Sequence, residues 1–265
     1  MFSVSRRWYP QSFAVELLLA AIVFALTVTI GYPQVIFHRR SLVASDNLNP
    51  LDYRYNAADY GPRFIPAEEW NKRGLLPYAN LADPGSAWWQ DEPNLHFFRH
   101  GILSGQFPWW DPYAGCGVPA YTNLTPAMLF PPQVILSLIG ATSTEKNAYI
   151  LGLFWVAGFG TYCLLRLHLL SIIASAIGGL AFLFSGGVQQ IAHVTFMLQV
   201  VAFIPALLIV TRLFLDQPSW RRSAVLALTY AVVALASFPP LLLGGFSFCV
   251  LYFACALFEK RRNTG

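Results

Sequence analysis

Charged side chains are scarce in this chain of 265 residues. Lys, Arg, Asp and Glu together make up 11% of it, against about 25% in an ordinary soluble domain, while hydrophobic residues make up 56%. The shortage is most severe between residues 147 and 258. The charged residues in that range are Arg166, Arg212, Asp216, Arg221 and Arg222. Because a soluble protein needs a more polar surface than this, the composition excludes that class.

Cysteine is also scarce, and its spacing excludes two kinds of site. The four cysteines form neither a zinc pattern nor a disulfide framework, so we interpret them mainly as small packing residues (Cys116, Cys163, Cys249 and Cys255). His96 and His100 have the i,i+4 spacing of two metal ligands, but no third ligand is evident. We therefore expect no metal and no other cofactor.

What the sequence has in place of charge is a series of long apolar runs. About 20 apolar residues in a helix cross about 30 Å of hydrocarbon. The runs predict an all-α membrane protein with about six transmembrane helices, and a first helix that is retained and not cleaved as a signal peptide. The runs are Phe13–Ile30, Ala148–Leu165, Leu170–Gly187, Thr195–Leu215, Ser223–Phe238 and Leu241–Phe258.

These runs divide the chain into four parts. Residues 1–33 hold the N-terminal end and the first helix, and residues 34–146 form one long loop. Residues 147–258 hold five further helices, and residues 259–265 form a tail. Within the long loop, the apolar segment 128–140 is too short to span comfortably and contains a Pro-Pro pair, so we interpret it as re-entrant or interfacial.

The basic residues predict the orientation. With six helices, Arg166, the 212–222 loop and Lys260–Arg262 all fall on the side of the N-terminus, and the short breaks on the other side contain no Lys or Arg. Loops rich in Lys and Arg stay in the cytoplasm. This pattern predicts a cytoplasmic N-terminus and an extracytoplasmic 34–146 loop. Because orientation in the membrane explains the net charge of +4, we expect no nucleic-acid binding.

The end of the long loop has the most definite pattern. The spacing of Leu95, Phe98, Ile102 and Leu103 predicts a short amphipathic helix over 93–103 that lies on the membrane surface. Gly105 would end this helix. The following FPWWDPY segment is typical of a turn with aromatic side chains at the interface. Asp111 precedes a proline, which favours a role in the turn over a role in catalysis.

The order of these motifs resembles that of the YfhO-like bacterial membrane proteins. An acidic residue and the amphipathic helix are followed by LSGQFPWWDPY, by GVP and by an apolar run with Pro-Pro; FLFSGGVQQIAH and a helix with an internal proline come later. The resemblance covers about residues 85–245. Pro240 in ASFPP stands where the family commonly has glutamine. Chains of this family are much longer, so we expect this one to correspond to the N-terminal portion and its tail to be truncated.

The resemblance implies a polytopic glycosyltransferase of the GT-C fold in the bacterial inner membrane. Such an enzyme takes a sugar from a polyprenyl-phosphate donor and places it on an extracytoplasmic glycan or protein acceptor. A carboxylate in the first extracytoplasmic loop would act as general base, because a hydroxyl is a poor nucleophile. By position, Asp91 is the first candidate and Glu92 the second.

The donor's phosphate needs cations or hydrogen-bond donors. His96, Arg99 and His100 would share one polar helix face and are candidate substrate-binding residues, although a face toward lipid headgroups is an alternative. Gln189 and His193 at the outer end of the third helix are further candidates, and interfacial capping is their alternative. Glu16 is expected to snorkel or to pair with Arg6 or Arg7.

Two other functions stay open. The first is a non-catalytic polytopic protein of cell-envelope assembly whose loop binds a lipid-linked glycan or a partner. The second is a transporter, which the sequence disfavours because no membrane segment shows a charged pair at mid-depth.

Overall fold

The protein is a multi-pass, all-α membrane protein. The computed structural model describes residues 11–37, 42, 92–112, 116–120, 127–140, 142–236 and 238–262. Among these residues, five helical segments are long and apolar enough to cross a bilayer. They are formed by α1 (Gln11–Gly31), α8 (Ser143–Leu167), α9 (Ile172–Leu183) continued by α10 (Gly186–Gln190), α11 (Thr195–Asp216) and α13 (Pro239–Arg262).

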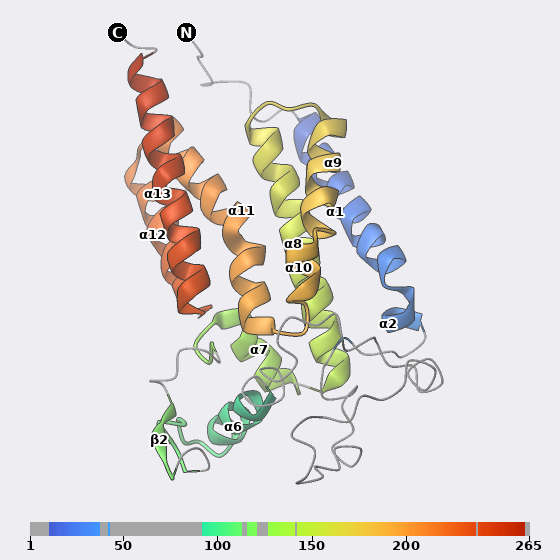
Figure 1. The fold of residues 1–265 in the computed structure, drawn as a ribbon, viewed down its shortest axis with the longest axis vertical. Helices are drawn as coiled ribbons and strands as arrows, with labels where there is room; N and C mark the ends of the chain where they lie inside the picture. Colours follow the sequence, from blue (N-terminus) through green and yellow to red (C-terminus); the bar gives the residue numbers. More distant parts are fainter. Residues whose placement is uncertain are drawn as a thin grey trace, which may run out of the picture.

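A sixth helix, α12 (Trp220–Ala234), runs beside α11 and α13 (Figure 1). It has 15 residues, and at 1.5 Å per residue it is about 22 Å long. The prediction of about six transmembrane helices therefore corresponds to five helices of full spanning length and this shorter one.

The helices alternate in direction, so that α1 begins and α13 ends at the same end of the bundle (Figure 1). We call this the terminal end, and we call the opposite end the α7 end. An even number of antiparallel passes places both chain ends on one side, which is the arrangement that the orientation argument requires. No membrane is present in the structure, so the orientation itself stays a prediction.

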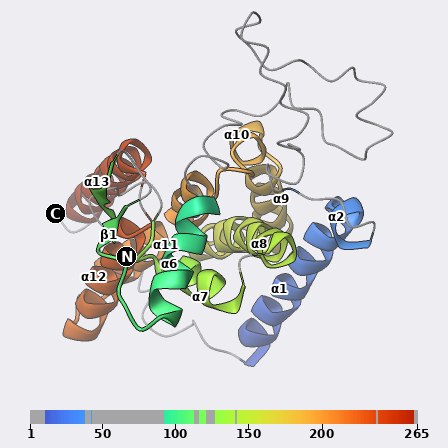
Figure 2. The same cartoon turned by 90° about the horizontal axis from the view of Figure 1, so that it is seen from below.

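The α7 end holds the short elements of the structure (Figure 2). There α6 packs against α7, and α7 contacts the start of α8. With nine residues, α7 is too short to cross a bilayer, and two prolines occupy its first turn, where a missing backbone N–H costs nothing. These elements are α2 (Pro33–Phe37), α6 (Glu92–Leu103), α7 (Pro131–Ile139) and the antiparallel pair β1 (Trp110–Asp111) and β2 (Val118–Pro119).

At the centre of the bundle, two glycines let α1, α8 and α9 approach closely. Phe24 of α1 is 2% exposed. A Cβ atom on Gly179 would lie 2.6 Å from the Phe24 ring and 2.7 Å from the carbonyl oxygen of Gly158, and one on Gly158 would lie 2.9 Å from the same ring. Small residues at helix contacts of this kind are typical of membrane bundles.

Four membrane helices begin earlier than the predicted runs: α1 at Gln11, α8 at Ser143, α12 at Trp220 and α13 at Pro239. Helix α8 begins at Ser143, five residues before the expected Ala148, and at this end the Thr142 hydroxyl donates to the Glu145 carboxylate. Helix α13 begins at Pro239 and not at Leu241, since proline is tolerated in a first turn.

The structure gives Glu16 a partner that the sequence did not suggest. Among the described residues its partner is Arg166 of α8, with Nε 2.6 Å from Oε1 and Nη2 3.0 Å from Oε2. Arg6 and Arg7 lie outside the described residues. The sequence could not show this pair, because its members are 150 positions apart.

Candidate functional site

The candidate site lies at the α7 end, and α6 is the element that organises it. Leu95 and Phe98, three residues apart on this helix, are 2% and 3% exposed, so one face of α6 packs inward as predicted. Gly105, with a φ of 75°, ends the helix. The Gly105 amide donates to Ile102 and the Gln106 amide donates to Gly101, which together form a Schellman motif.

The aromatic segment after α6 folds back onto it. Phe107 contacts Phe98 edge to face at 6.0 Å, and Trp109 contacts Phe107 at 4.4 Å between ring centroids. Trp109 and Trp110 are more than half exposed, as side chains at a membrane interface can be. Asp111 lies in β1 opposite Val118, so the hairpin uses this residue as a strand position.

The three predicted phosphate-binding residues on α6 have different surroundings. Arg99 donates from Nη1 to the carbonyl oxygen of Ser137 at 2.8 Å and also to that of Leu138. It therefore neutralises the C-terminal end of α7, a favourable place for a cation. His96 and His100 are exposed on α6.

The two candidate carboxylates, Asp91 and Glu92, are adjacent in the sequence. Asp91 lies outside the described residues. Glu92 is the first residue of α6, and nothing of its side chain is described. Among the described residues, no group of three or more His, Cys, Asp or Glu side chains could hold a metal ion.

At the α7 end, six polar side chains of α7, of the start of α8 and of the start of α11 are buried, and we call this set the polar belt. Polar groups taken out of water need hydrogen-bond partners, so such a concentration at the mouth of a bundle is characteristic of a site or of a structural network. Its members are 0–3% exposed: Gln133 and Ser137 of α7, Lys146 of α8, His193 before α11, and Thr195 and Gln199 of α11.

Gln199 connects the belt to several helices. Its side-chain carbonyl accepts a hydrogen bond from the Tyr149 hydroxyl of α8, and its amide donates to the carbonyl of Ala236, at 3.2 Å, between α12 and α13. Tyr149 also packs against Leu95 and Leu136. This tyrosine of α8 thus contacts α6, α7 and α11, and it holds α6 and α7 against the bundle.

Lys146 is the only cation in the belt. It lies in the first turn of α8 and is 3% exposed. A buried ammonium group is costly unless it has a partner, and Lys146 is not without one. An ammonium held at the mouth of a membrane bundle is suited to an anionic ligand such as a phosphate.

The two candidate residues near the third helix have different surroundings. Gln189 accepts a hydrogen bond from the Tyr32 hydroxyl and donates from Nε2 to the Leu183 carbonyl at 2.7 Å. Its amide therefore joins α10 to the end of α1. His193 is 3% exposed and belongs to the polar belt.

Tyr32, the hydrogen-bond partner of Gln189, also contacts α8. Its ring stacks on Phe154 at 5.2 Å between centroids. Burial raises the pKa of the Tyr32 phenol to about 12, and the hydrogen bond to Gln189 opposes part of this rise. The phenol is therefore a hydrogen-bond donor at neutral pH.

Sequence reasoning missed Lys146, Tyr149 and Gln199. Of these three residues, only Gln199 could have been noticed in the sequence, because it is a single side-chain amide inside an apolar run. Lys146 stands immediately before a predicted helix, where a lysine at a membrane surface is ordinary. Nothing in the sequence paired Tyr149 with Gln199, 50 positions away.

Comparison of the chain with protein-family models, with curated proteins and with solved structures found no match.

Proposed function

We propose that this protein is a membrane glycosyltransferase of the GT-C type that uses a polyprenyl-phosphate sugar donor. The observation that carries the proposal is the polar belt with its buried Lys146, at the end of an apolar bundle where α6 packs on α7 and α7 on α8. A lipid-linked sugar needs such surroundings, because its chain lies in hydrocarbon while its phosphate and sugar lie at the interface.

The proposed reaction has one proton transfer and one displacement. Asp91, or Glu92 in its place, takes the proton of the acceptor hydroxyl as that oxygen attacks the anomeric carbon. The bond between this carbon and the phosphate oxygen breaks, and the electron pair leaves with the polyprenyl phosphate. Lys146 stabilises the charge that grows on the leaving phosphate.

The proposal gives new roles to two of the original substrate candidates. Arg99 and Gln189 hold α7 and α10 in place, so they act as positioning residues. His96 and His100 face outward from α6 and are candidates for contact with the acceptor or with lipid headgroups. The acceptor is an extracytoplasmic glycan or protein, and the location is the inner membrane with the N-terminus in the cytoplasm.

A second candidate function is a non-catalytic protein of envelope assembly that binds a lipid-linked glycan at the same place. The observation that favours it is the structural use of Arg99 and Gln189, which leaves fewer groups for a reaction.

A transfer assay in membranes of the source cells separates the two functions. Cells lacking the gene are complemented with the wild type, Asp91→Asn or the control Asp59→Asn, and membranes are given polyprenyl-phosphate donors labelled in the sugar. Loss of label from the lipid fraction measures transfer, whatever the acceptor. We expect Asp91→Asn to lower the gene-dependent rate by about 10²- to 10⁴-fold and Asp59→Asn to preserve it.

Lys146 provides an independent test. We expect Lys146→Met to lower transfer by at least about tenfold and Lys146→Arg to retain more of it, since a cation remains. Transfer that does not depend on the gene would favour the binding protein. Normal transfer by Asp91→Asn and Glu92→Gln would remove both carboxylates from the mechanism.

A further inference from the structure

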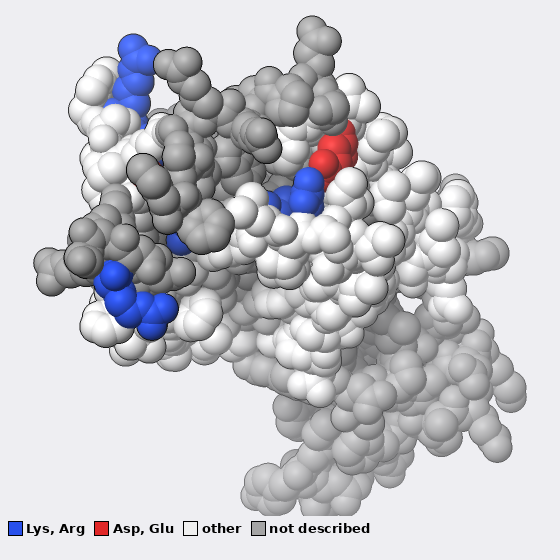
Figure 3. Space-filling view, turned by 90° about the horizontal axis from the view of Figure 1, so that it is seen from above, with Lys and Arg blue, Asp and Glu red and all other residues white. Residues whose placement is uncertain are grey.

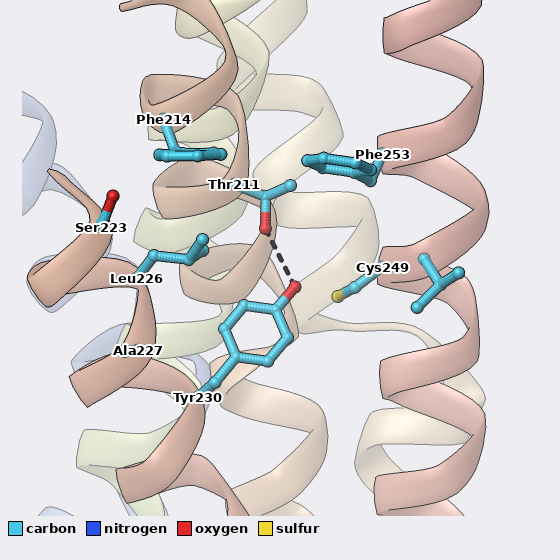
Figure 4. A pocket seen from close by; sticks show the side chains of 9 residues that line it. Thr211, Phe214, Ser223, Leu226, Ala227, Tyr230, Cys249 and Phe253 are labelled. Carbon is cyan, nitrogen blue, oxygen red and sulfur yellow. Dashed lines mark hydrogen bonds between the residues drawn. The ribbon is translucent and has the colours of Figure 1, made fainter. Parts of the chain in front are cut away.

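A cavity of about 400 Å³ lies between α11, α12 and α13, away from the polar belt (Figure 4). It is open to the outside and not enclosed. We call it the α12 cleft. Its walls are formed by Thr211 and Phe214 of α11, by Ser223, Leu226, Ala227 and Tyr230 of α12, and by Cys249, Val250 and Phe253 of α13.

The hydroxyl groups in these walls are already satisfied. Thr211 donates to the carbonyl of Leu207 at 2.7 Å, so the hydroxyl of Tyr230, 2.9 Å away, donates to Thr211 (Figure 4). Ser223 donates to the Ser219 carbonyl at 3.0 Å. An occupant of the cleft is therefore selected by apolar contact and not by hydrogen bonds.

The surface around the cleft is one that faces hydrocarbon. Leu228 of α12 and Val250 and Leu251 of α13 are 63–66% exposed. In a bilayer, lipid chains cover such side chains, and an apolar cleft between them stays free of water. A transmembrane helix, about 10–12 Å across, is too wide for a cavity of this volume, whereas a single hydrocarbon chain is not.

Two arginines, Arg221 and Arg222, directly precede Ser223, the first cleft-lining residue of α12. Trp220 precedes Ser223 by three residues and so lies on the same side of α12. The Arg221 guanidinium lies over the Trp220 ring, 5.7 Å from its centroid. Figure 3 shows Lys and Arg side chains over α12 and α13 at this terminal end.

The described charged side chains closest to Arg221 in the sequence are engaged with other groups. Asp216 pairs with Arg212 at 3.1 Å, and Arg222 donates to the Leu213 carbonyl at 2.6 Å. Among the described side chains, which do not include that of Glu259, no carboxylate lies within ion-pair distance of Arg221. A guanidinium beside a tryptophan at a membrane surface is suited to a phosphate.

We propose that the α12 cleft is a binding site for an anionic phospholipid of the bilayer. One acyl chain fills the cleft between α11, α12 and α13, and the headgroup phosphate lies beside Arg221. The site is separate from the polar belt and does not depend on the proposed transferase activity.

Photo-crosslinking tests the acyl-chain contact. The purified chain is placed in phosphatidylcholine nanodiscs that contain phosphatidylglycerol with a diazirine near the end of one acyl chain, and the labelled peptides are identified by mass spectrometry. We expect labelling on the cleft-lining segments of α11, α12 and α13. Ala227→Trp fills the cleft and should lower this labelling by about fivefold or more, whereas Ala224→Trp, on the same helix but outside the lining, should leave it unchanged.

A second comparison in the same experiment tests the headgroup contact. Phosphatidylglycerol should label the cleft about fivefold more than phosphatidylcholine with the same diazirine, a preference worth about one cation. Arg221→Gln should remove this preference, and Arg262→Gln, also a terminal-end cation, should retain it. Thermal melting of each variant shows that it is folded.

Three outcomes would overturn the proposal. Equal labelling of the Ala227→Trp and Ala224→Trp variants would exclude the cleft as the chain site. Equal labelling by the two phospholipids would exclude an anionic headgroup. Displacement of the photolipid by a much smaller amount of polyprenyl phosphate would assign the cleft to that lipid.

Discussion

Glu16 of α1 and Arg166 of α8 form a two-point ion pair across the terminal end of the bundle. The Tyr162 hydroxyl donates a third hydrogen bond, at 2.7 Å, to the same carboxylate. Each of these two charges thus has its counter-charge on the neighbouring helix. The pair fixes the rotation of α1 against α8, a contact for which the rest of the interface offers mainly apolar packing.

We expect Glu16→Gln to destabilise the protein by roughly 2 kcal/mol. The value lies below the 3–5 kcal/mol of a fully buried pair because the two side chains are 19% and 18% exposed. For a chain of this size the apparent Tm should fall by about 4–8 °C. The measurement is thermal unfolding in one detergent or nanodisc preparation.

Asp216→Asn is the matched control, since it breaks an i,i+4 pair with Arg212 within one helix. Such pairs contribute about 0.3–0.5 kcal/mol. Replacing both Glu16 and Arg166 with leucine should restore part of the stability, because no unpaired charge remains. Equal shifts for Glu16→Gln and Asp216→Asn would contradict the role of the pair.

The packing of Phe24 against Gly158 and Gly179 predicts that shortening Phe24 relieves an alanine at one of these glycines but not at the other. Gly179→Ala should cost about 1–3 kcal/mol, because its Cβ meets both the Phe24 ring and the Gly158 carbonyl. A second substitution, Phe24→Leu, should relieve Gly158→Ala but not Gly179→Ala, since a backbone oxygen cannot move aside. A double-mutant cycle on unfolding free energies measures the difference.

Gly187→Ala serves as control for both glycines, because a Cβ there meets nothing within 4 Å. If Gly179→Ala proved as stable as Gly187→Ala, the close approach of α8 and α9 would be wrong.

Tyr32 predicts how stability changes in alkaline solution. Its pKa of about 12 lies above the ordinary value of about 10, so its contribution is fully present below pH 10 and is lost as the pH rises through 12. Tyr32→Phe should therefore flatten the loss of stability between about pH 10 and 12. The phenolate absorbance should lose a step near pH 12, and loss of a step near pH 10 instead would disprove the assignment.

The orientation can be tested at two exposed positions on opposite ends of the bundle. In a variant without the four natural cysteines, Gln106→Cys is expected to react with a membrane-impermeant thiol reagent from outside the cell. Ser219→Cys should react only after the membrane is opened. The reverse pattern would show the opposite orientation, with the polar belt on the cytoplasmic side.

The sequence predicted elements whose signals are local. The spacing of Leu95 and Phe98 and the glycine at 105 were enough for α6, and the apolar runs were enough for the membrane helices, because hydrophobic length and periodicity are properties of a short window. The hydrogen bonds from Arg99 to the C-terminal end of α7 were not predictable, since a cation on an amphipathic helix can face water, lipid or a helix end equally well.

The contacts that shape the candidate site were missed for a different reason. Tyr149 with Gln199, and Tyr32 with Gln189, join residues 50 and 157 positions apart. In hydrocarbon every polar side chain needs a partner, but any polar group of another helix can supply it. The requirement can be read from the sequence, whereas the choice of partner depends on how the helices pack.

The short length of α12 has a consequence for the lipid itself. A helix of about 22 Å does not match about 30 Å of hydrocarbon, so the bilayer beside it must become thinner or its polar ends must reach outward. Neighbouring α11 and α13 have 22 and 24 residues and hold the full thickness. Either response has a free-energy cost that grows with the mismatch, so we expect the insertion of this side of the protein to be sensitive to the thickness of the bilayer that receives it.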